Sequence, residues 1–174
     1  MTKSGTAAPT KPPLAEGMTS GVQATQVWGE DSRIDAGVYI AERITFTSQG
    51  EQVVANIFLP KTSGQNPAIV LLGPVGTVKE QSVIQYATRL ARMGFITLIF
   101  DPRTMGESAG EPRRNESGSS KVQDLNAAIE YLATRREVNA ARLFIVGLCQ
   151  GANWAVETAL INPSVGGVAL VAGH

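Results

Sequence analysis

The sequence predicts an α/β protein with a mainly parallel sheet, an N-terminal antiparallel hairpin and helices on both faces. Two observations support this prediction. Short apolar runs alternate with amphipathic helical stretches between residues 67 and 173. Within the runs, apolar residues are continuous rather than alternating, as in strands that helices bury on both sides. With 174 residues, the chain has the length of one domain.

The elements follow in a regular order. Two β-like runs, 41–47 and 52–59, flank "SQG" and predict a hairpin. The later elements predicted are a strand (67–73), a helix with its apolar stripe on 83–91, a strand (95–101), a helix with its stripe on 122–132, a strand (142–147), a helix (152–160) and a strand (166–173). Gly94 is placed as a helix C-cap. The carboxyl ends of parallel strands carry the ligand-binding loops, so we expect the site at that rim.

Residues 1–35 are rich in Thr, Ser, Pro, Gly and Ala and lack periodic hydrophobicity. This composition predicts a flexible leader, which leaves 36–174 as the folded domain. The leader has no apolar core of a secretory signal, and no run approaches the roughly 20 residues that span a bilayer. A single cysteine forms no internal disulfide, which fits a reducing compartment. We therefore expect a cytoplasmic protein.

Charge and composition exclude several classes of partner. The formal net charge is zero, the pI is near 6.6, and no block of five like charges occurs, so neither nucleic acid nor an anionic membrane is expected. No metal-ligand cluster is visible. A dinucleotide or flavin module is disfavoured because no G-x-G-x-x-G follows the first parallel strand. We expect a small-molecule partner, no metal and no cofactor.

The segment "GLCQGA", residues 147–152, has the pattern of a nucleophile elbow. Gly147 and Gly151 flank Cys149 at spacing two, as the tight strand-to-helix turn requires. The following helix directs the positive end of its dipole at the thiol and favours the thiolate. The N–H of Gln150 is then placed to donate to an oxyanion. The alternative is that Cys149 is a small buried residue beneath the helix.

A second oxyanion donor is expected in the loop "GPVG", residues 73–76. Pro74 has no N–H, so Val75 or Gly76 is the candidate donor. Other charged residues at this rim receive structural roles. Asp101 is expected to fix the next loop by hydrogen bonds, with a catalytic acid as the alternative. Lys79 and Glu80 are expected to open a helix. Four further residues are expected to be loop and surface charges: Arg103, Glu107, Arg113 and Arg114.

Four segments together resemble the α/β-hydrolases of the dienelactone hydrolase and YcjY-like group: "GPVGTVKEQ", "GFITLIFDPRTMGESAGEPR", "DLNAAIEYLA" and "EVNAARLFIVGLCQGA". The resemblance runs from about residue 41 to residue 174. It implies that Cys149 attacks an ester or lactone carbonyl to form an acyl-thioester, with the N–H groups of Gln150 and Val75 holding the oxyanion. Gly73 and Val75 depart from the His-Pro-Gly-Gly loop of many relatives.

In such hydrolases the acid and the histidine follow the nucleophile along the chain. The only histidine here is His174, and the strand that leads to it is expected beside the strand that leads to Cys149. His174 is therefore a candidate partner of Cys149, but the favoured interpretation is that it lines the rim of a longer parent protein. The chain resembles only the N-terminal part of a catalytic domain, truncated after the strand that follows the elbow helix.

The last strand, 166–173, is apolar on both faces and is expected at the edge of the sheet. Natural proteins avoid unpaired edges of this kind. We therefore expect either the N-terminal part of a longer hydrolase, which we favour, or a homo-oligomer that pairs through this strand. The leading functional hypothesis is an esterase or lactonase that acts through Cys149. The alternative is a truncated, catalytically silent homologue that binds a ligand or self-associates.

Overall fold

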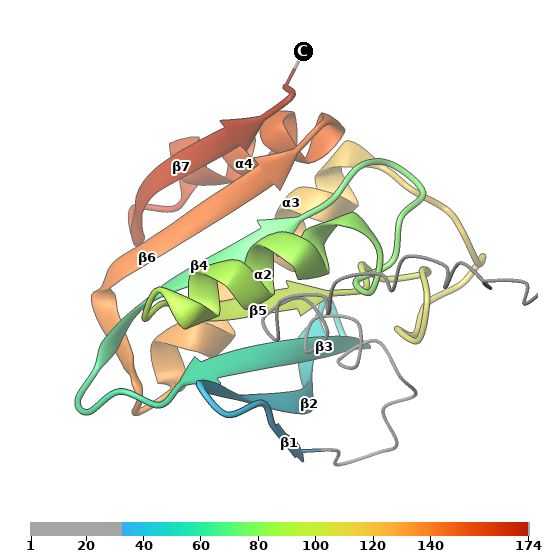
Figure 1. Ribbon diagram of the computed structural model, residues 1–174. Helices are drawn as coiled ribbons and strands as arrows, with labels where there is room; N and C mark the ends of the chain where they lie inside the picture. Colours follow the sequence, from blue (N-terminus) through green and yellow to red (C-terminus); the bar gives the residue numbers. More distant parts are fainter. Residues whose placement is uncertain (1–32, 174) are drawn as a thin grey trace, which may run out of the picture.

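The computed structural model describes residues 33–173, which form one sheet with strand order β1-β2-β3-β5-β4-β6-β7 (Figure 1). The strands are β1 (Arg33–Asp35), β2 (Tyr39–Ser48), β3 (Glu51–Pro60), β4 (Asn66–Leu72), β5 (Ile96–Phe100), β6 (Val138–Leu148) and β7 (Val165–Val171). The helices are α2 (Ser82–Arg92), α3 (Gly118–Thr134) and α4 (Gln150–Ile161). Of the expected leader, residues 1–32 lie outside the described residues, and the last three form β1.

One half of the sheet is antiparallel. β2 pairs with β1 and β3, and β3 also pairs with β5. The β2–β3 connection is the expected hairpin, since Ser48 pairs with Glu51. Both turn residues have positive φ, 50° at Gln49 and 83° at Gly50, as a two-residue hairpin turn with matching twist requires. The hairpin predicted from 41–59 is confirmed.

The other half is parallel and positions the site. β4 lies between β5 and β6, and β7 pairs with β6. Leu72 at the end of β4 is in register with Gly147 in β6. The chain therefore leaves β4 and β6 side by side at the same rim. The expected adjacency of the last strand and the strand before Cys149 is also confirmed.

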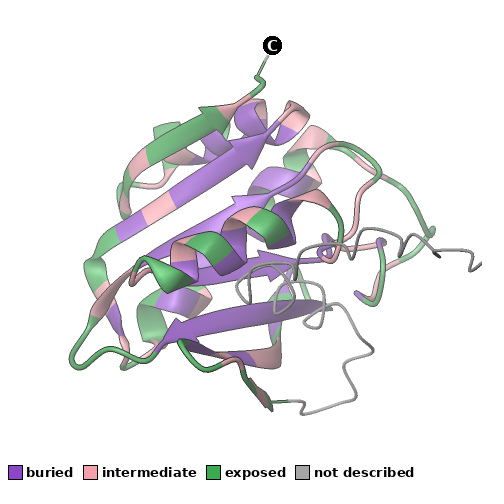
Figure 2. Ribbon diagram, in the orientation of Figure 1, coloured by how far each residue is buried: buried purple, intermediate pink, exposed green. Residues whose placement is uncertain are grey.

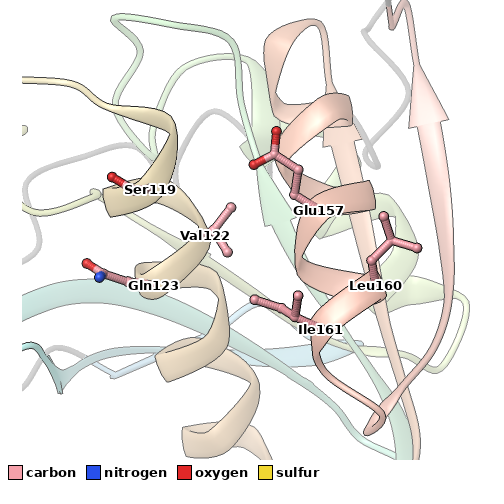
Figure 3. A pocket seen from close by; sticks show the side chains of 6 residues that line it. All are labelled: Ser119, Val122, Gln123, Glu157, Leu160 and Ile161. Carbon is pink, nitrogen blue, oxygen red and sulfur yellow. The ribbon is translucent and has the colours of Figure 1, made fainter.

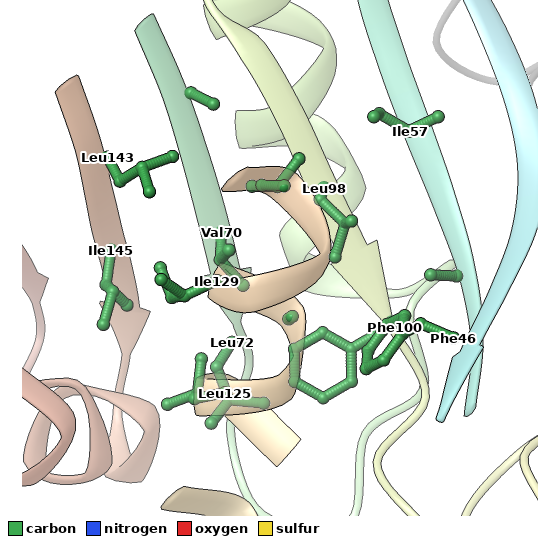
Figure 4. Packing of buried hydrophobic residues seen from close by; sticks show 14 of the residues in the cluster. Phe46, Ile57, Val70, Leu72, Leu98, Phe100, Leu125, Ile129, Leu143 and Ile145 are labelled. Atoms are coloured by element: carbon green, nitrogen blue, oxygen red, sulfur yellow. The ribbon is translucent and has the colours of Figure 1, made fainter. Parts of the chain in front are cut away.

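Helices cover both faces of the sheet, α2 on one and α3 and α4 on the other (Figure 1). On the α3 face, Leu125 and Ile129 pack over strand residues that include Val70 and Leu98 (Figure 4). On the α2 face, Ile84 and its neighbours form a second buried cluster. The expected mixed sheet between helices is thus confirmed. Within residues 33–173, no helix combines the length and apolar character that crossing a bilayer demands.

The C-terminal edge of the sheet is exposed. β3, β4 and β5 are largely buried, whereas β7 is mostly exposed (Figure 2). Leu170 and Val168 are 51% and 38% exposed. Among the described strands, β7 pairs with β6 alone. The predicted edge position of this strand is confirmed.

Candidate active site

Cys149 lies at a sharp corner between β6 and α4. Its φ of 54° and ψ of −124° fall where residues with a side chain are rarely found. Such a conformation costs on the order of 1–3 kcal/mol and persists only where the surroundings enforce it. The N–H of Cys149 donates to the carbonyl of Val171 (2.8 Å), and its carbonyl accepts from the N–H of Ala152 (3.0 Å). The half-buried thiol is therefore held in a strained, fixed turn.

The two flanking glycines allow close approach of backbone segments. A Cβ at Gly151 would lie 2.5 Å from the carbonyl oxygen of Leu72 and 2.8 Å from that of Gly73. A Cβ at Gly147 would lie 2.6 Å from the Cα of Ala152. Real Cβ atoms do not approach backbone so closely, so only glycine fits at either position. The start of α4 thus packs directly against the end of β4 and the loop that follows it.

The loop after β4 has a backbone N–H group that is available to donate to an oxyanion. The N–H of Gly76 donates to Oε1 of Glu116 (2.8 Å), so that donor is occupied. The N–H of Val75 makes no hydrogen bond within residues 33–173, and the Val75 side chain is 59% exposed. Gln150 is the first residue of α4, where N–H groups have no partner within the helix. Val75, rather than Gly76, is therefore the candidate donor opposite Gln150.

Glu116 belongs to a second set of contacts. Its Oε2 lies 3.0 Å from Nζ of Lys121, and the two side chains are only 14% and 3% exposed. The same ammonium lies 5.5 Å from the centre of the Trp154 ring in α4, within the range of a cation–π interaction. The loop after β4, helix α3 and the elbow helix are thus joined through Glu116 and Lys121. Neither residue was singled out from the sequence.

Asp101 has the structural role that the sequence predicts. It is fully buried, and its carboxylate accepts hydrogen bonds from the N–H of Lys79 (2.8 Å) and the N–H of Glu107 (2.9 Å). These bonds fix both the loop after β4 and the loop after β5. Because its oxygens are engaged in this way, Asp101 is a structural residue.

The prediction for Lys79 is wrong, because α2 begins later, at Ser82, and Lys79 is buried at the rim. Its Nζ lies 2.8 Å from Oδ2 of Asp101, 2.5 Å from Oε2 of Glu107 and 2.8 Å from Oε1 of Glu80. Burial alone would lower the pKa of Lys79, but the charge of Asp101 and hydrogen bonds to the carboxylates outweigh it, so that its pKa is raised. Lys79 is therefore a charged buried residue that joins two rim loops.

Two of the expected surface charges have more specific roles. The Nε of Arg103 lies 2.6 Å from Oδ1 of Asp124, and these side chains are 14% and 0% exposed. Burial alone would raise the pKa of Glu107, but the hydrogen bond and charge of Lys79, together with Arg43, hold it below the usual value. Arg113 and Arg114 are exposed, as expected.

The candidate for the general base lies outside the described residues. His174, the only histidine in the chain, lies outside the described residues. The chain that leads to it reaches the elbow, because the carbonyl of Val171 accepts the hydrogen bond from Cys149. The structure therefore brings together Cys149, Gln150 and the Val75 loop, and leaves the pairing of Cys149 with His174 untested.

Two hollows lie near these elements. A polar pocket of about 800 Å³ borders the loop after β4, lined by Gly76, Glu116, Met105 and Arg114 among others. A shallower apolar groove of about 460 Å³ lies between α3 and α4, where Val122, Leu160 and Ile161 are seen together (Figure 3). The α4 residues of this groove come two or more turns after Cys149. The polar pocket, not the helical groove, adjoins the candidate site.

This fold, with a cysteine on a strained strand-to-helix turn at the rim of the sheet, defines an α/β-hydrolase. The model of the dienelactone hydrolase family matches residues 53–173. The chain therefore belongs to the dienelactone hydrolase family, whose members are hydrolases.

Relatives at the level of sequence include two bacterial proteins. The uncharacterized protein PA2218 of Pseudomonas aeruginosa is 37% identical over 147 residues, which cover 83% of this chain and 39% of that protein. The uncharacterized protein YcjY of Escherichia coli is 36% identical over 124 residues, 68% of this chain and 40% of that protein. The chain thus spans about two fifths of the length of these relatives.

A solved structure and a fungal relative extend the comparison. The crystal structure of PA2218 superimposes with a TM-score of 0.79 at 34% identity and covers 86% of this chain and 47% of that one. A thiohydrolase of Eupenicillium brefeldianum is 29% identical over 98 residues, 56% of this chain and 32% of that protein. The resemblance in fold expected from the four sequence motifs is confirmed.

Proposed function

We propose that this protein hydrolyses carboxylic ester or lactone bonds with Cys149 as the nucleophile. The observation that supports the proposal most is the strained backbone of Cys149, φ 54° and ψ −124°, at the N-terminus of α4. A conformation of this cost is typical of functional turns. A small buried residue with only a packing role would not require it.

In the proposed reaction, the Sγ thiolate of Cys149 attacks the carbonyl carbon and forms a tetrahedral oxyanion. The N–H groups of Gln150 and Val75 stabilise that oxyanion. The C–O bond to the leaving alcohol then breaks, the alkoxide takes up a proton, and an acyl-thioester remains on Cys149. Water attacks the thioester, which releases the carboxylic acid and restores the thiolate.

We propose His174 as the base that activates the thiol and then the water. The support is positional: β7 precedes His174 by a few residues, and its last residue, Val171, is hydrogen-bonded to Cys149. The family match and the relative named a thiohydrolase support a hydrolase reaction. We expect turnover of substrate by the 174 residues alone to be low.

The test is a short-chain nitrophenyl ester assay of the chain beside Cys149→Ala and His174→Ala. We expect release of nitrophenolate and, by mass spectrometry of peptides, an acyl group on Cys149. Cys149→Ala should abolish both, and His174→Ala should slow acylation and leave the acyl group in place for longer. Full activity in Cys149→Ala would refute the proposed nucleophile.

A second candidate function is supported by the exposed edge strand β7. Its unpaired side and its apolar residues Val168 and Leu170 suit pairing with another chain. In this alternative the protein is a catalytically silent homologue that self-associates or binds a partner through β7. Sedimentation at several concentrations tests it. A concentration-dependent dimer that Leu170→Lys weakens would support it, and a monomer at all concentrations would refute self-association.

A further inference from the structure

We propose that Glu116 is a positioning residue for the oxyanion-binding loop, with the buried side chain of Lys121 packed behind it. This inference rests on the proposed function, because it assumes that the N–H of Val75 stabilises the oxyanion. It assigns a role to two residues about 30 positions before the nucleophile, which the pattern of the elbow does not include. It concerns the loop's conformation, and neither side chain takes part in bond making.

The loop needs an external contact to hold its conformation. Val75 is 59% exposed, and Gly76 has a left-handed φ of 74°. Within the loop, the Thr77 hydroxyl donates to the carbonyl of Pro74 (2.8 Å). At its far end, the N–H of Lys79 is bonded to Asp101. Between these points, Oε1 of Gln81 accepts from the N–H of Val78 (3.0 Å), and the carboxylate of Glu116 accepts from the N–H of Gly76. Gln81 lies at the end of the same segment, so Glu116 is the contact that comes from another part of the chain.

The contact lies next to the proposed donor. Oε1 of Glu116 accepts from the N–H of Gly76 at 2.8 Å. This N–H belongs to the peptide unit that directly follows Val75, so its direction fixes ψ of Val75 and ties down the adjacent peptide. Glu116 therefore occupies one N–H and leaves that of Val75 available to the substrate oxygen. A charged acceptor makes the bond stronger than a neutral one.

Glu116 is itself fixed from the protein interior. Its second oxygen lies 3.0 Å from the buried ammonium of Lys121, which lies over the ring of Trp154 in α4. Trp154 approaches α3 closely, because a Cβ at Gly118 would lie 3.2 Å from its Nε1. The same contacts thus reach the loop with Val75 and the helix with Gln150. Both proposed donors are held relative to one another.

A purely stabilising role accounts less well for this pair. Burying two charges has a desolvation cost that often cancels their attraction, and apolar replacements are commonly as stable. What an apolar pair cannot provide is an acceptor for the N–H of Gly76. The proposal therefore makes a specific prediction: the acceptor oxygen at position 116 matters more for the reaction than the two charges.

The experiment compares two reactions of the same thiol. Acylation of Cys149 by nitrophenyl acetate passes through an oxyanion, whereas alkylation by iodoacetamide does not, and both need the thiolate. In Glu116→Ala we expect acylation to slow on the order of 10-fold to 100-fold, since loss of an oxyanion donor costs about 100-fold to 1,000-fold and displacement costs less. The rate of alkylation should stay within about 2-fold of the unmodified chain, because nothing in that reaction uses the oxyanion donors.

Glu116→Gln/Lys121→Met is the matched control. It removes both charges, fills the same volume and keeps an amide oxygen for the N–H of Gly76. We expect it to retain most of the acylation rate, including if Glu116→Ala proves poorly folded. A double variant that acylates as slowly as Glu116→Ala while alkylating normally would overturn the role of the acceptor. So would normal acylation in folded Glu116→Ala.

The outcomes also separate this inference from the proposed function. If the unmodified chain is not acylated at Cys149, the proposed function fails and this inference fails with it. If the unmodified chain is acylated and Glu116→Ala reacts equally fast, only the positioning role is refuted. A parallel fall in acylation and alkylation would point to a change in the thiol itself and would likewise refute the positioning role.

Discussion

Nζ of Lys79 lies 2.8 Å from Oδ2 of Asp101, and both side chains are 1% exposed. This buried pair joins the loop after β4 to the end of β5, because the N–H of Lys79 also donates to Asp101. The segment that carries Val75 is thus attached at one end to Asp101 and near its middle to Glu116. Two separate ion pairs fix the loop that faces the elbow.

Lys79→Met should reduce the free energy of unfolding by about 3 kcal/mol. Removing one partner of a buried pair leaves the other charge without compensation, which typically costs about 3–5 kcal/mol. The two N–H donors that remain to Asp101 place the expected cost at the lower end. Urea denaturation measures it, and Lys61→Met is the control. Lys61 forms an exposed pair with Asp35, with side chains 39% and 63% exposed, so its loss should cost much less than the loss of Lys79. Equal costs for the two variants would contradict the prediction.

The contribution of the Lys79 network to the free energy of unfolding should change with pH in both the alkaline and the acid range. The raised pKa of Lys79 means that its contribution is complete below the usual value of 10.5 and is lost as the pH rises through the folded-state pKa. The lowered pKa of Glu107 means that its contribution is complete above the usual value of 4.5 and is lost as the pH falls through the folded-state pKa.

A separate variant tests the alkaline and the acid range. The difference in unfolding free energy between the unmodified chain and Lys79→Met should shrink at strongly alkaline pH. The difference from Glu107→Gln should shrink under acid conditions. Both differences should be flat at neutral pH, and denaturation across the pH range at constant ionic strength measures them. A difference for Glu107→Gln that grows as the pH falls would contradict the assignment.

The parallel strands and their helices could be predicted because each carries a local pattern. Continuous apolar runs such as β5 are typical of strands buried on both faces, and the stripe that includes Val83 and Ile84 is typical of an amphipathic helix. β1 escaped prediction because three residues, Arg33–Asp35, are too few to show a period. Its position comes from pairing with β2.

The elbow could be predicted from its glycines, but the ion pairs around it could not. Lys79 follows a turn and precedes a helix, where charged residues are usually exposed, and only the packing of the β5 loop buries it. Glu116 meets Gly76 across 40 residues of sequence, so no local spacing indicates the contact. The buried Asp101 was the one available signal, since a buried carboxylate at a strand end requires donors.

Gly151→Ala should destabilise the fold strongly, by about 3 kcal/mol. The added Cβ would lie 2.5 Å from the carbonyl oxygen of Leu72, which is backbone and cannot move without displacing the end of β4. Gly167→Ala is the control, because its nearest neighbour, a ring carbon of Phe144, would lie at an ordinary 3.6 Å. That variant should change stability by less than about 0.5 kcal/mol. Thermal or urea unfolding compares them, and a tolerated alanine at 151 would contradict the tight packing of α4 on β4.

Cys149→Gly should make the protein more stable than Cys149→Ala, although both lack the thiol. With φ at 54° and ψ at −124°, any side chain at this corner is strained, and glycine is not. The difference between the two variants should be about 1 kcal/mol in favour of glycine. At Asn153, inside α4, the same comparison should reverse, since glycine in a helix is about 1 kcal/mol less favourable than alanine. Both variants at 149 lose the contacts of the sulfur and differ only in the Cβ, so the comparison reports mainly on the backbone conformation. Opposite signs at 149 and 153 would show that the fold holds Cys149 in a conformation that reduces its own stability. The same sign at both positions would refute the strain on which the proposed nucleophile depends.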